Sequence, residues 1–294
     1  DGRVPGGRDR AAHWIQDQHH QQTIVDDFVL WHYRVPFQEN LRPALERALD
    51  LARGNPSGPV YLELPREILL EECRPAPPAR RSKRRSALSA DGRSLDLAAA
   101  WLMEAQCPLV LVSQLGRNPQ AVEELVQLAE ALALPVVESR HYHNFPLSNP
   151  LHQGHRPLEW LPEADLVVVV DHDVPWIPRQ WQPSPDCRVV QLDQDTSKSS
   201  MSMWNFPVDL SLQGDSAELL RELRQRLPAR AGQNAHIDSR RALCEQRHRQ
   251  RRLQEHDRAW AGREQSPMSP EWVACCLQQC LDERALVMCE AVTS

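Results

Sequence analysis

The stretch GPVYLELPREIL, residues 58–69, predicts a β-strand with a break at each end. Val60, Leu62 and Leu64 alternate with more polar side chains, which is the period of a half-buried strand. Gly-Pro precedes the strand and a proline follows it, and these residues commonly interrupt regular structure. A helical pattern over residues 41–54 leads into the strand, so the two segments form one step of an α/β layer.

The segment after this strand has the composition of a linker. Residues 74–90, RPAPPARRSKRRSALSA, are rich in proline and in basic side chains and contain little that could form a core. A basic block of this kind could also bind nucleic acid. No aromatic residues are interleaved with it, and the net charge of the chain is −6, so we expect no nucleic-acid partner.

The next part of the chain alternates between strand-like and helix-like patterns. Short apolar runs predict five strands, at residues 108–113, 134–139, 164–171, 188–195 and 207–215. Helical patterns occupy residues 95–105, 119–133 and 216–227, the second with Asn118 as a plausible cap. This order predicts a Rossmann-like α/β fold, with a parallel sheet and helices on both faces. Asp171 and Asp193 end the third and fourth strands, at the edge where such sheets bind ligands.

The remaining residues suggest a second linker and a new folding unit. Residues 229–266 are polar and rich in Arg and Gln, and part of them could form a solvated helix. A fresh helix follows, with Ser269 as its cap and Pro270 in its first position, and then a strand-like run at 284–290. The chain therefore divides into residues 1–73, a linker at 74–90, a domain at 91–228, a linker at 229–266, and a further unit at 267–294.

Composition also limits the cellular setting. Apolar runs such as residues 97–103 and 166–170 are too short to cross a bilayer, so we expect no membrane partner. Eight cysteines lie at irregular spacings, which is typical of reduced thiols, and we therefore expect a cytoplasmic protein.

Three motifs along the chain carry a family resemblance. Residues 58–68 fit a strand of the form G-P-V-x-L-x-L-P-x-[DE]-[VI], and residues 189–195, VVQLDQD, fit V-x-x-[IL]-D-x-D. Between them, NPLHQG at residues 149–154 fits H-P-L-x-x-G, with Asn149 in place of the histidine. In this order the motifs resemble the thiamine-diphosphate-dependent enzymes of the acetolactate synthase and benzoylformate decarboxylase family.

The resemblance implies a complete nucleotide-binding-like central domain, flanked by the end of a pyrimidine-binding domain and the start of a diphosphate-binding domain. It also implies an enzyme that uses thiamine diphosphate and Mg²⁺ on 2-keto acids, as a homodimer or homotetramer. In the family, the catalytic glutamate would lie upstream of Asp1, and the G-D-G motif that binds Mg²⁺ would lie beyond Ser294. We therefore assign no catalytic or metal-binding residue within this chain and expect the isolated chain to be inactive.

The resemblance also raises the question of FAD, which acetolactate synthases hold in the central domain. The first loop here, SQLGRN at 113–118, has a single glycine, and the loop DHDVPW at 171–176 is acidic where the FAD-binding members carry arginines. These departures favour a scaffold without a nucleotide. If a nucleotide does bind, we expect it at the following residues: Gln114, Gly116, Arg117, Ser139, Arg140, Asp171 and Asp193.

The sequence leaves open the role of Gln16 and an alternative, non-catalytic function of the chain. Gln16, in HWIQDQ, resembles the glutamine of an F-Q-E segment that approaches the active site in acetolactate synthases, although a structural polar loop is an equally good interpretation. The alternative function is a non-catalytic module that binds FAD or NAD or that interacts with another subunit.

Overall fold

The computed structural model divides the chain into two compact units, Asp1–Ser86 and Ala87–Ser294. It describes residues 15, 18–54, 56–72, 89–139, 142–228, 231, 235–282, 284, 285 and 287. The division falls inside the segment 74–90, where the sequence predicts a linker.

The first unit is a small parallel α/β layer. In chain order it contains η1 (Gln21–Ile24), η2 (Asp26–Phe28), β1 (Trp31–Arg34), α2 (Gln38–Ala52), β2 (Val60–Glu63) and α3 (Arg66–Leu70). β1 pairs with β2 in parallel, and Trp31 lies opposite Val60. The strand predicted from GPVYLELPREIL is thus confirmed.

The second unit contains a five-stranded, wholly parallel sheet. Its strands are β3 (Pro108–Val112), β4 (Val136–Glu138), β5 (Leu166–Val170), β6 (Arg188–Asp193) and β7 (Leu210–Gln213), in the order β4-β3-β5-β6-β7. All five correspond to the strands predicted from apolar runs, although each is shorter than its run. β3 and β5 are buried along their whole length, as expected for central strands covered on both faces.

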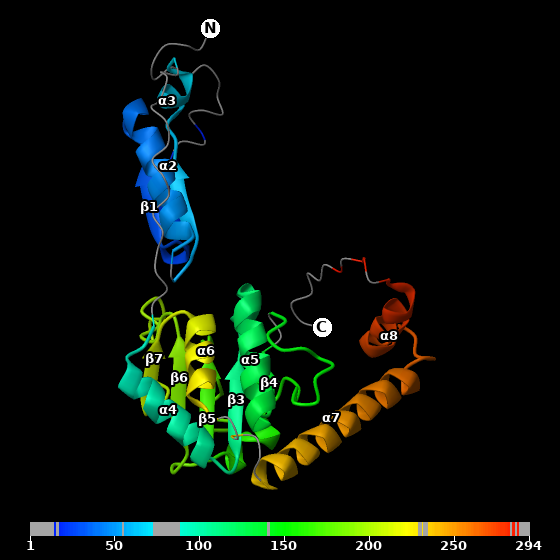
Figure 1. The fold of residues 1–294 in the computed structure, drawn as a ribbon. Helices are drawn as coiled ribbons and strands as arrows, with labels where there is room; N and C mark the ends of the chain where they lie inside the picture. Colours follow the sequence, from blue (N-terminus) through cyan, green and yellow to red (C-terminus); the bar gives the residue numbers. More distant parts are fainter. Residues whose placement is uncertain are drawn as a thin grey trace. The chain divides into compact units, whose positions relative to one another are not determined.

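The three long helices of this sheet domain pack on one face of the sheet. They are α4 (Gly92–Glu104), α5 (Pro119–Leu132) and α6 (Ser216–Arg226), and Figure 1 shows them in front of the strands. Their buried side chains form one apolar cluster with alternate strand residues such as Val112, Val170 and Leu192. Asp91, Asn118 and Asp215 cap the three helices by accepting hydrogen bonds from backbone N–H groups in the first turn.

The opposite face of the sheet has a different cover. The short 3-10 helices η4 (Pro157–Glu159) and η5 (Leu161–Glu163) and extended loop segments supply Leu161, Trp176 and Cys187 to a second apolar cluster. The predicted α/β class is confirmed. Helices lie on both faces, but the long helices are all on one face and the other has only short 3-10 helices and loops. The reason is that the connections after β4, β5 and β6 contain no long amphipathic helix.

Two further helices follow the sheet domain. α7 (Ala235–Ala261) is mostly exposed, as predicted for a solvated helix, but its first turns are anchored. The buried Arg240 donates hydrogen bonds to the carbonyl oxygens of Leu132 and Ala133 at the end of α5, and to that of Gln106 just after α4. α8 (Pro270–Cys280) begins as predicted, with the Ser269 hydroxyl accepting from a backbone N–H. Most of the predicted strand at 284–290 lies outside the described residues. No helix in the described part of the chain is long and apolar enough to span a membrane.

Candidate functional site

The carboxyl edge of the sheet is the candidate site, because the order of the strands reverses there. From β3 the chain passes through α5 to β4 on one side, and β5, β6 and β7 follow on the other. The ends of β3 and β5 therefore border a topological switch point, the usual ligand position in open parallel sheets. Gln114, Ser139, Asp171 and Asp193, all predicted as candidates, lie at or just beyond the ends of β3, β4, β5 and β6.

A chain of hydrogen bonds and ion pairs crosses this edge. We call it the Lys198 network, and it consists of Gln114, Asp173, Lys198 and Asp193. Gln114 Nε2 donates to Asp173 Oδ2 at 2.5 Å, and Lys198 Nζ donates to Asp173 Oδ1 at 2.8 Å and to Asp193 Oδ2 at 2.6 Å. The Lys198 side chain is only 8% exposed, and that of Asp193 only 5%. The network thus joins the ends of β3, β5 and β6.

Burial and charge act against each other on the ionisable groups of the network. Burial lowers the pKa of Lys198, but its hydrogen bonds to Asp173 and Asp193 and their charges outweigh burial, and the net shift is upward. Burial raises the pKa of Asp193, and the hydrogen bond from Lys198 opposes this. Lys198 therefore remains a cation whose charge is balanced by two neighbouring carboxylates.

Asp171 is the most strongly perturbed carboxyl group at this edge. Its side chain is buried and accepts a hydrogen bond from Ser216 Oγ at 2.7 Å. Burial, followed by the nearby charge of Asp193, raises the pKa of Asp171 to about 6. Its backbone has a φ of 44°, in the left-handed region that aspartate and asparagine enter more readily than most residues. Asp171 thus turns the chain sharply away from the end of β5.

The turn after β3 is closed over by another part of the chain. Gly116, in η3 (Leu115–Arg117), donates its backbone N–H to Asn144 Oδ1 at 3.1 Å. A methyl group on Gly116 would lie 2.7 Å from the carbonyl oxygen of His143, so this loop leaves no room above the glycine. Asn144 is fully buried and is itself held by a bond from its Nδ2 to the carbonyl oxygen of Tyr142, at 2.8 Å.

The other predicted residues contribute less. Ser139 Oγ lies 2.5 Å from Ser113 Oγ, and Arg117 is exposed, with its Nε donating back to the carbonyl oxygen of Gln114. Gln16 and Arg140 lie outside the described residues. The structure therefore brings Gln114, Gly116, Arg117, Ser139, Asp171 and Asp193 to one edge, but their role in binding a ligand stays a prediction.

Sequence reasoning missed three residues of the site: Asp173, Lys198 and Asn144. Asp173 and Lys198 carried a usable signal, because each closely follows an aspartate that ends a predicted strand. Asn144 carried none, because its partner Gly116 lies 28 residues earlier in the sequence.

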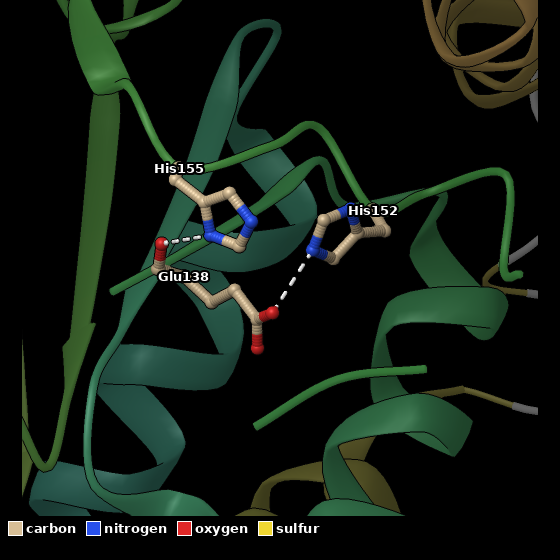
Figure 2. A group of neighbouring side chains, drawn as sticks. All are labelled: Glu138, His152 and His155. Carbon is tan, nitrogen blue, oxygen red and sulfur yellow. Dashed lines mark hydrogen bonds and ion pairs between the residues drawn. The ribbon is translucent and has the colours of Figure 1, made fainter. Parts of the chain in front are cut away.

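A second polar cluster lies at the end of β4 and contains Glu138, His152 and His155 (Figure 2). His152 Nε2 lies 3.2 Å from Glu138 Oε1, and His155 Nδ1 lies 3.1 Å from the carbonyl oxygen of Glu138. The other carboxylate oxygen, Oε2, accepts the backbone N–H groups of Asn144 and Phe145. One carboxylate and two imidazoles are a possible ligand set for a divalent metal ion.

The partners of His152 favour a proton over a metal ion in this cluster. Arg251 Nη2 of α7 lies 3.1 Å from His152 Nδ1, and an arginine can only donate there. His152 Nε2 then carries the ring proton and donates it to Glu138, so it has no lone pair for a metal ion. Burial raises the pKa of Glu138, but hydrogen bonds from His152 and Asn144 outweigh burial and lower it. The cluster thus anchors the loop after β4 and the helix α7 around an ionised Glu138.

The first unit contains an open hollow of about 300 Å³. Trp31, Tyr33, Asn40, Pro43, Ala44 and Arg47 line it. The rings of Trp31 and Tyr33 stack, and Arg47 lies over the Trp31 ring. Its lining contains no carboxylate, thiol or imidazole, and Tyr33 is the one lining residue of a type that serves as a general acid or base.

FAD does not fit the carboxyl edge of the sheet domain. A dinucleotide needs backbone N–H groups open to its phosphates and side chains that balance their charge. Here the N–H of Gly116 is bonded to Asn144, the charge of Lys198 is balanced by two carboxylates, and the turn after β5 adds Asp171. The sequence-based preference for a scaffold without FAD agrees with this geometry.

Comparisons with known proteins agree with the fold and indicate its family. Residues 95–223 match the sequence model of the family described as "Thiamine pyrophosphate enzyme, central domain". The chain is 25% identical over 237 residues to sulfoacetaldehyde acetyltransferase of Rhodobacter capsulatus, covering 72% of this chain and 37% of that protein. It is 24% identical over 205 residues to 2-hydroxyacyl-CoA lyase 1 of Dictyostelium discoideum, covering 64% of this chain and 34% of that protein. The chain thus spans little more than a third of the length of these relatives.

Solved structures show the same fold. The benzoylformate decarboxylase of Polynucleobacter necessarius superposes with a TM-score of 0.59 at 23% identity, over 74% of this chain and 43% of that one. The thiamine diphosphate-dependent 4-hydroxybenzoylformate decarboxylase of Rhodococcus jostii RHA1 gives a TM-score of 0.59 at 21% identity, with the same coverage. The match extends beyond the five-stranded domain alone.

Proposed function

Because residues 95–223 are a central domain of the thiamine pyrophosphate enzyme family, we propose that this chain is part of an enzyme that uses thiamine diphosphate and Mg²⁺ on 2-keto acids. The reaction class is decarboxylation, or formation of a carbon–carbon bond from the decarboxylated fragment. The two curated relatives named above are an acetyltransferase and a lyase, and the solved relatives include two decarboxylases.

One observation carries the proposal: the likeness is longer than the central domain alone. The alignment with the acetyltransferase covers 237 residues, which is longer than the matched segment 95–223. In the first unit, residues 58–68, which contain β2, carry the motif that closes the pyrimidine-binding domain in the family that the chain resembles. This supports a multidomain enzyme over a free-standing central domain.

Thiamine diphosphate, when bound, supplies an electron sink for the carbanion that decarboxylation produces. We propose that it binds to parts of the protein outside residues 87–228, since the carboxyl edge of the sheet domain is filled by its own side chains. The sheet domain then acts as a rigid spacer, and the Lys198 network and Glu138 hold its loops in place. A cytoplasmic location and a homodimer or homotetramer are part of the same proposal.

The carboxyl edge does not favour the alternative, a nucleotide-binding module, because the N–H of Gly116 is bonded to Asn144 and the charge of Lys198 is balanced by two carboxylates. A free-standing subunit-interaction module would be expected to match the family over the central domain alone, whereas the alignment with the acetyltransferase is longer than that domain. We therefore favour the enzyme.

The direct test is a turnover assay on the native polypeptide that contains these residues. Release of CO₂ from pyruvate and from benzoylformate should require both thiamine diphosphate and Mg²⁺. The 294-residue chain, assayed in parallel, should release none. Absence of cofactor-dependent turnover with 2-keto acids in the native polypeptide would argue for the alternative.

A further inference from the structure

The carboxyl edge of the sheet domain contains a buried cation, Lys198, whose charge is already balanced by carboxylates of the protein. Lys198 is 7% exposed as a whole residue and lies at the ends of β5 and β6, beside the switch point. A buried ammonium group is costly unless it is paired, and here Asp173 and Asp193 both accept hydrogen bonds from it. Gln114 extends the contact to the end of β3, and Trp204 Nε1 donates to the carbonyl oxygen of Asp173 at 2.7 Å.

A second group occupies the position that a phosphate would take at the turn after β3. In dinucleotide-binding sheets, backbone N–H groups of this turn face the pyrophosphate, and glycine allows the close approach. Here the oxygen that meets the N–H of Gly116 belongs to the side chain of Asn144, and the His143 carbonyl lies against the glycine. An amide oxygen of the protein thus stands where a phosphate oxygen would stand.

We propose that the central domain is self-occupied: the Lys198 network and Asn144 fill the switch-point crevice and clamp the ends of β3, β5 and β6 together, so that the crevice takes no dinucleotide. The clamp depends on charge balance between one cation and two carboxylates. The proposal rests on the contacts of the Lys198 network and Asn144 and not on the proposed catalytic activity.

The clamp is tested by removing the cation and then restoring the charge balance. Lys198→Met leaves Asp193 buried without its partner, and breaking a buried pair in this way is strongly destabilising. We expect the folding equilibrium constant of the second unit, from urea denaturation followed by circular dichroism, to fall by about a hundredfold or more. Lys198→Met combined with Asp193→Asn removes both charges and should recover most of this loss.

A matched control is Arg188→Met, which breaks the exposed ion pair of Arg188 with Glu104 on the same sheet. Exposed pairs contribute little, so the folding equilibrium constant should change by less than about tenfold. An effect of Lys198→Met no larger than that of the control would overturn the clamp. So would a double variant that is no more stable than Lys198→Met alone.

The absence of a dinucleotide is tested by titrating the purified chain with FAD, NAD and ADP. Trp204 bonds to Asp173 within the network, so its fluorescence should report any ligand that displaces these contacts. We expect no visible flavin absorbance in the purified protein and no saturable change with any of the three ligands. Stoichiometric flavin, or saturable binding of any one of them, would overturn the proposal.

Discussion

Replacing Asp171 by asparagine should stabilise the protein at neutral pH. The pKa of Asp171 is raised from 3.8 to about 6, mainly because the side chain is buried. At pH 7 the group is therefore ionised in a site that favours its neutral form. Each pKa unit corresponds to about 1.4 kcal/mol, so the ionised state costs about 3 kcal/mol relative to the neutral one. Asparagine keeps an oxygen for the Ser216 hydroxyl and tolerates the backbone φ of 44°.

The sign of the pH dependence follows from where the proton is held. Between about pH 4 and pH 6 the folded protein retains a proton on Asp171 that the unfolded chain has released. The contribution of Asp171 to stability is therefore fully present below about pH 4 and is lost as the pH rises through 6. The Asp171→Asn variant lacks this titration, so its advantage over the wild type should grow from near zero at pH 4 to about 3 kcal/mol at pH 7.

Urea denaturation followed by circular dichroism, at several pH values from 4 to 7, measures this difference in the free energy of unfolding. Asp186→Asn is the matched control, because Asp186 is exposed and the same chemical change there should have little effect at any pH. A difference between Asp171→Asn and wild type that stays constant across this range would refute the reasoning. A variant less stable than the wild type at pH 7 would refute it as well.

Three further predictions concern the anchors of the second unit. Arg240→Ala should lower the free energy of unfolding by about 3 kcal/mol in urea denaturation, because buried carbonyl oxygens at the end of α5 and just after α4 lose their donor. Arg241→Ala is the control: Arg241 is partly exposed and its hydrogen bond to the carbonyl oxygen of Glu130 is exposed, so this change should cost less than about 1 kcal/mol. Glu138→Gln should speed hydrogen exchange at the two backbone N–H groups that its carboxylate accepts, and a chelator should leave the wild-type melting temperature unchanged. Burial raises the pKa of the Cys187 thiol to about 11 and that of the Cys244 thiol to about 12. Neither thiol should therefore react with a disulfide reagent at pH 8 until the protein is unfolded. Reaction of either thiol in the native protein would contradict this.

The fold could be predicted because its signals are local. Apolar runs such as residues 108–113 and 166–170 are too short for helices of this domain and too apolar for loops, so they had to be buried strands. Helix starts such as Asn118-Pro119 are recognisable because capping chemistry acts within one turn. The uneven cover of the sheet was not predictable in the same way, since the segments over its second face have no regular period.

The site was only partly predictable, because its contacts are not local. The parallel-sheet rule correctly places Asp171 and Asp193 at one edge. It does not say that Lys198 turns back toward Asp193, nor that the loop holding Asn144 lies on Gly116, since each depends on the path of an irregular loop. The sequence shows that the loops at residues 113–118 and 171–176 lack the glycines and arginines of the FAD-binding members that the chain resembles. It does not show that the Lys198 network and Asn144 occupy the carboxyl edge instead.

We propose that these residues belong to an enzyme that binds thiamine diphosphate with parts of the protein outside the sheet domain. Calorimetric titration of thiamine diphosphate, with Mg²⁺ present, into the native polypeptide and into the 294-residue chain tests it most directly. We predict saturable, Mg²⁺-dependent binding to the native polypeptide and none to the 294-residue chain. Failure of the native polypeptide to bind the cofactor would contradict the claim, and equal binding by the 294-residue chain would contradict the assignment of the site to other parts of the protein.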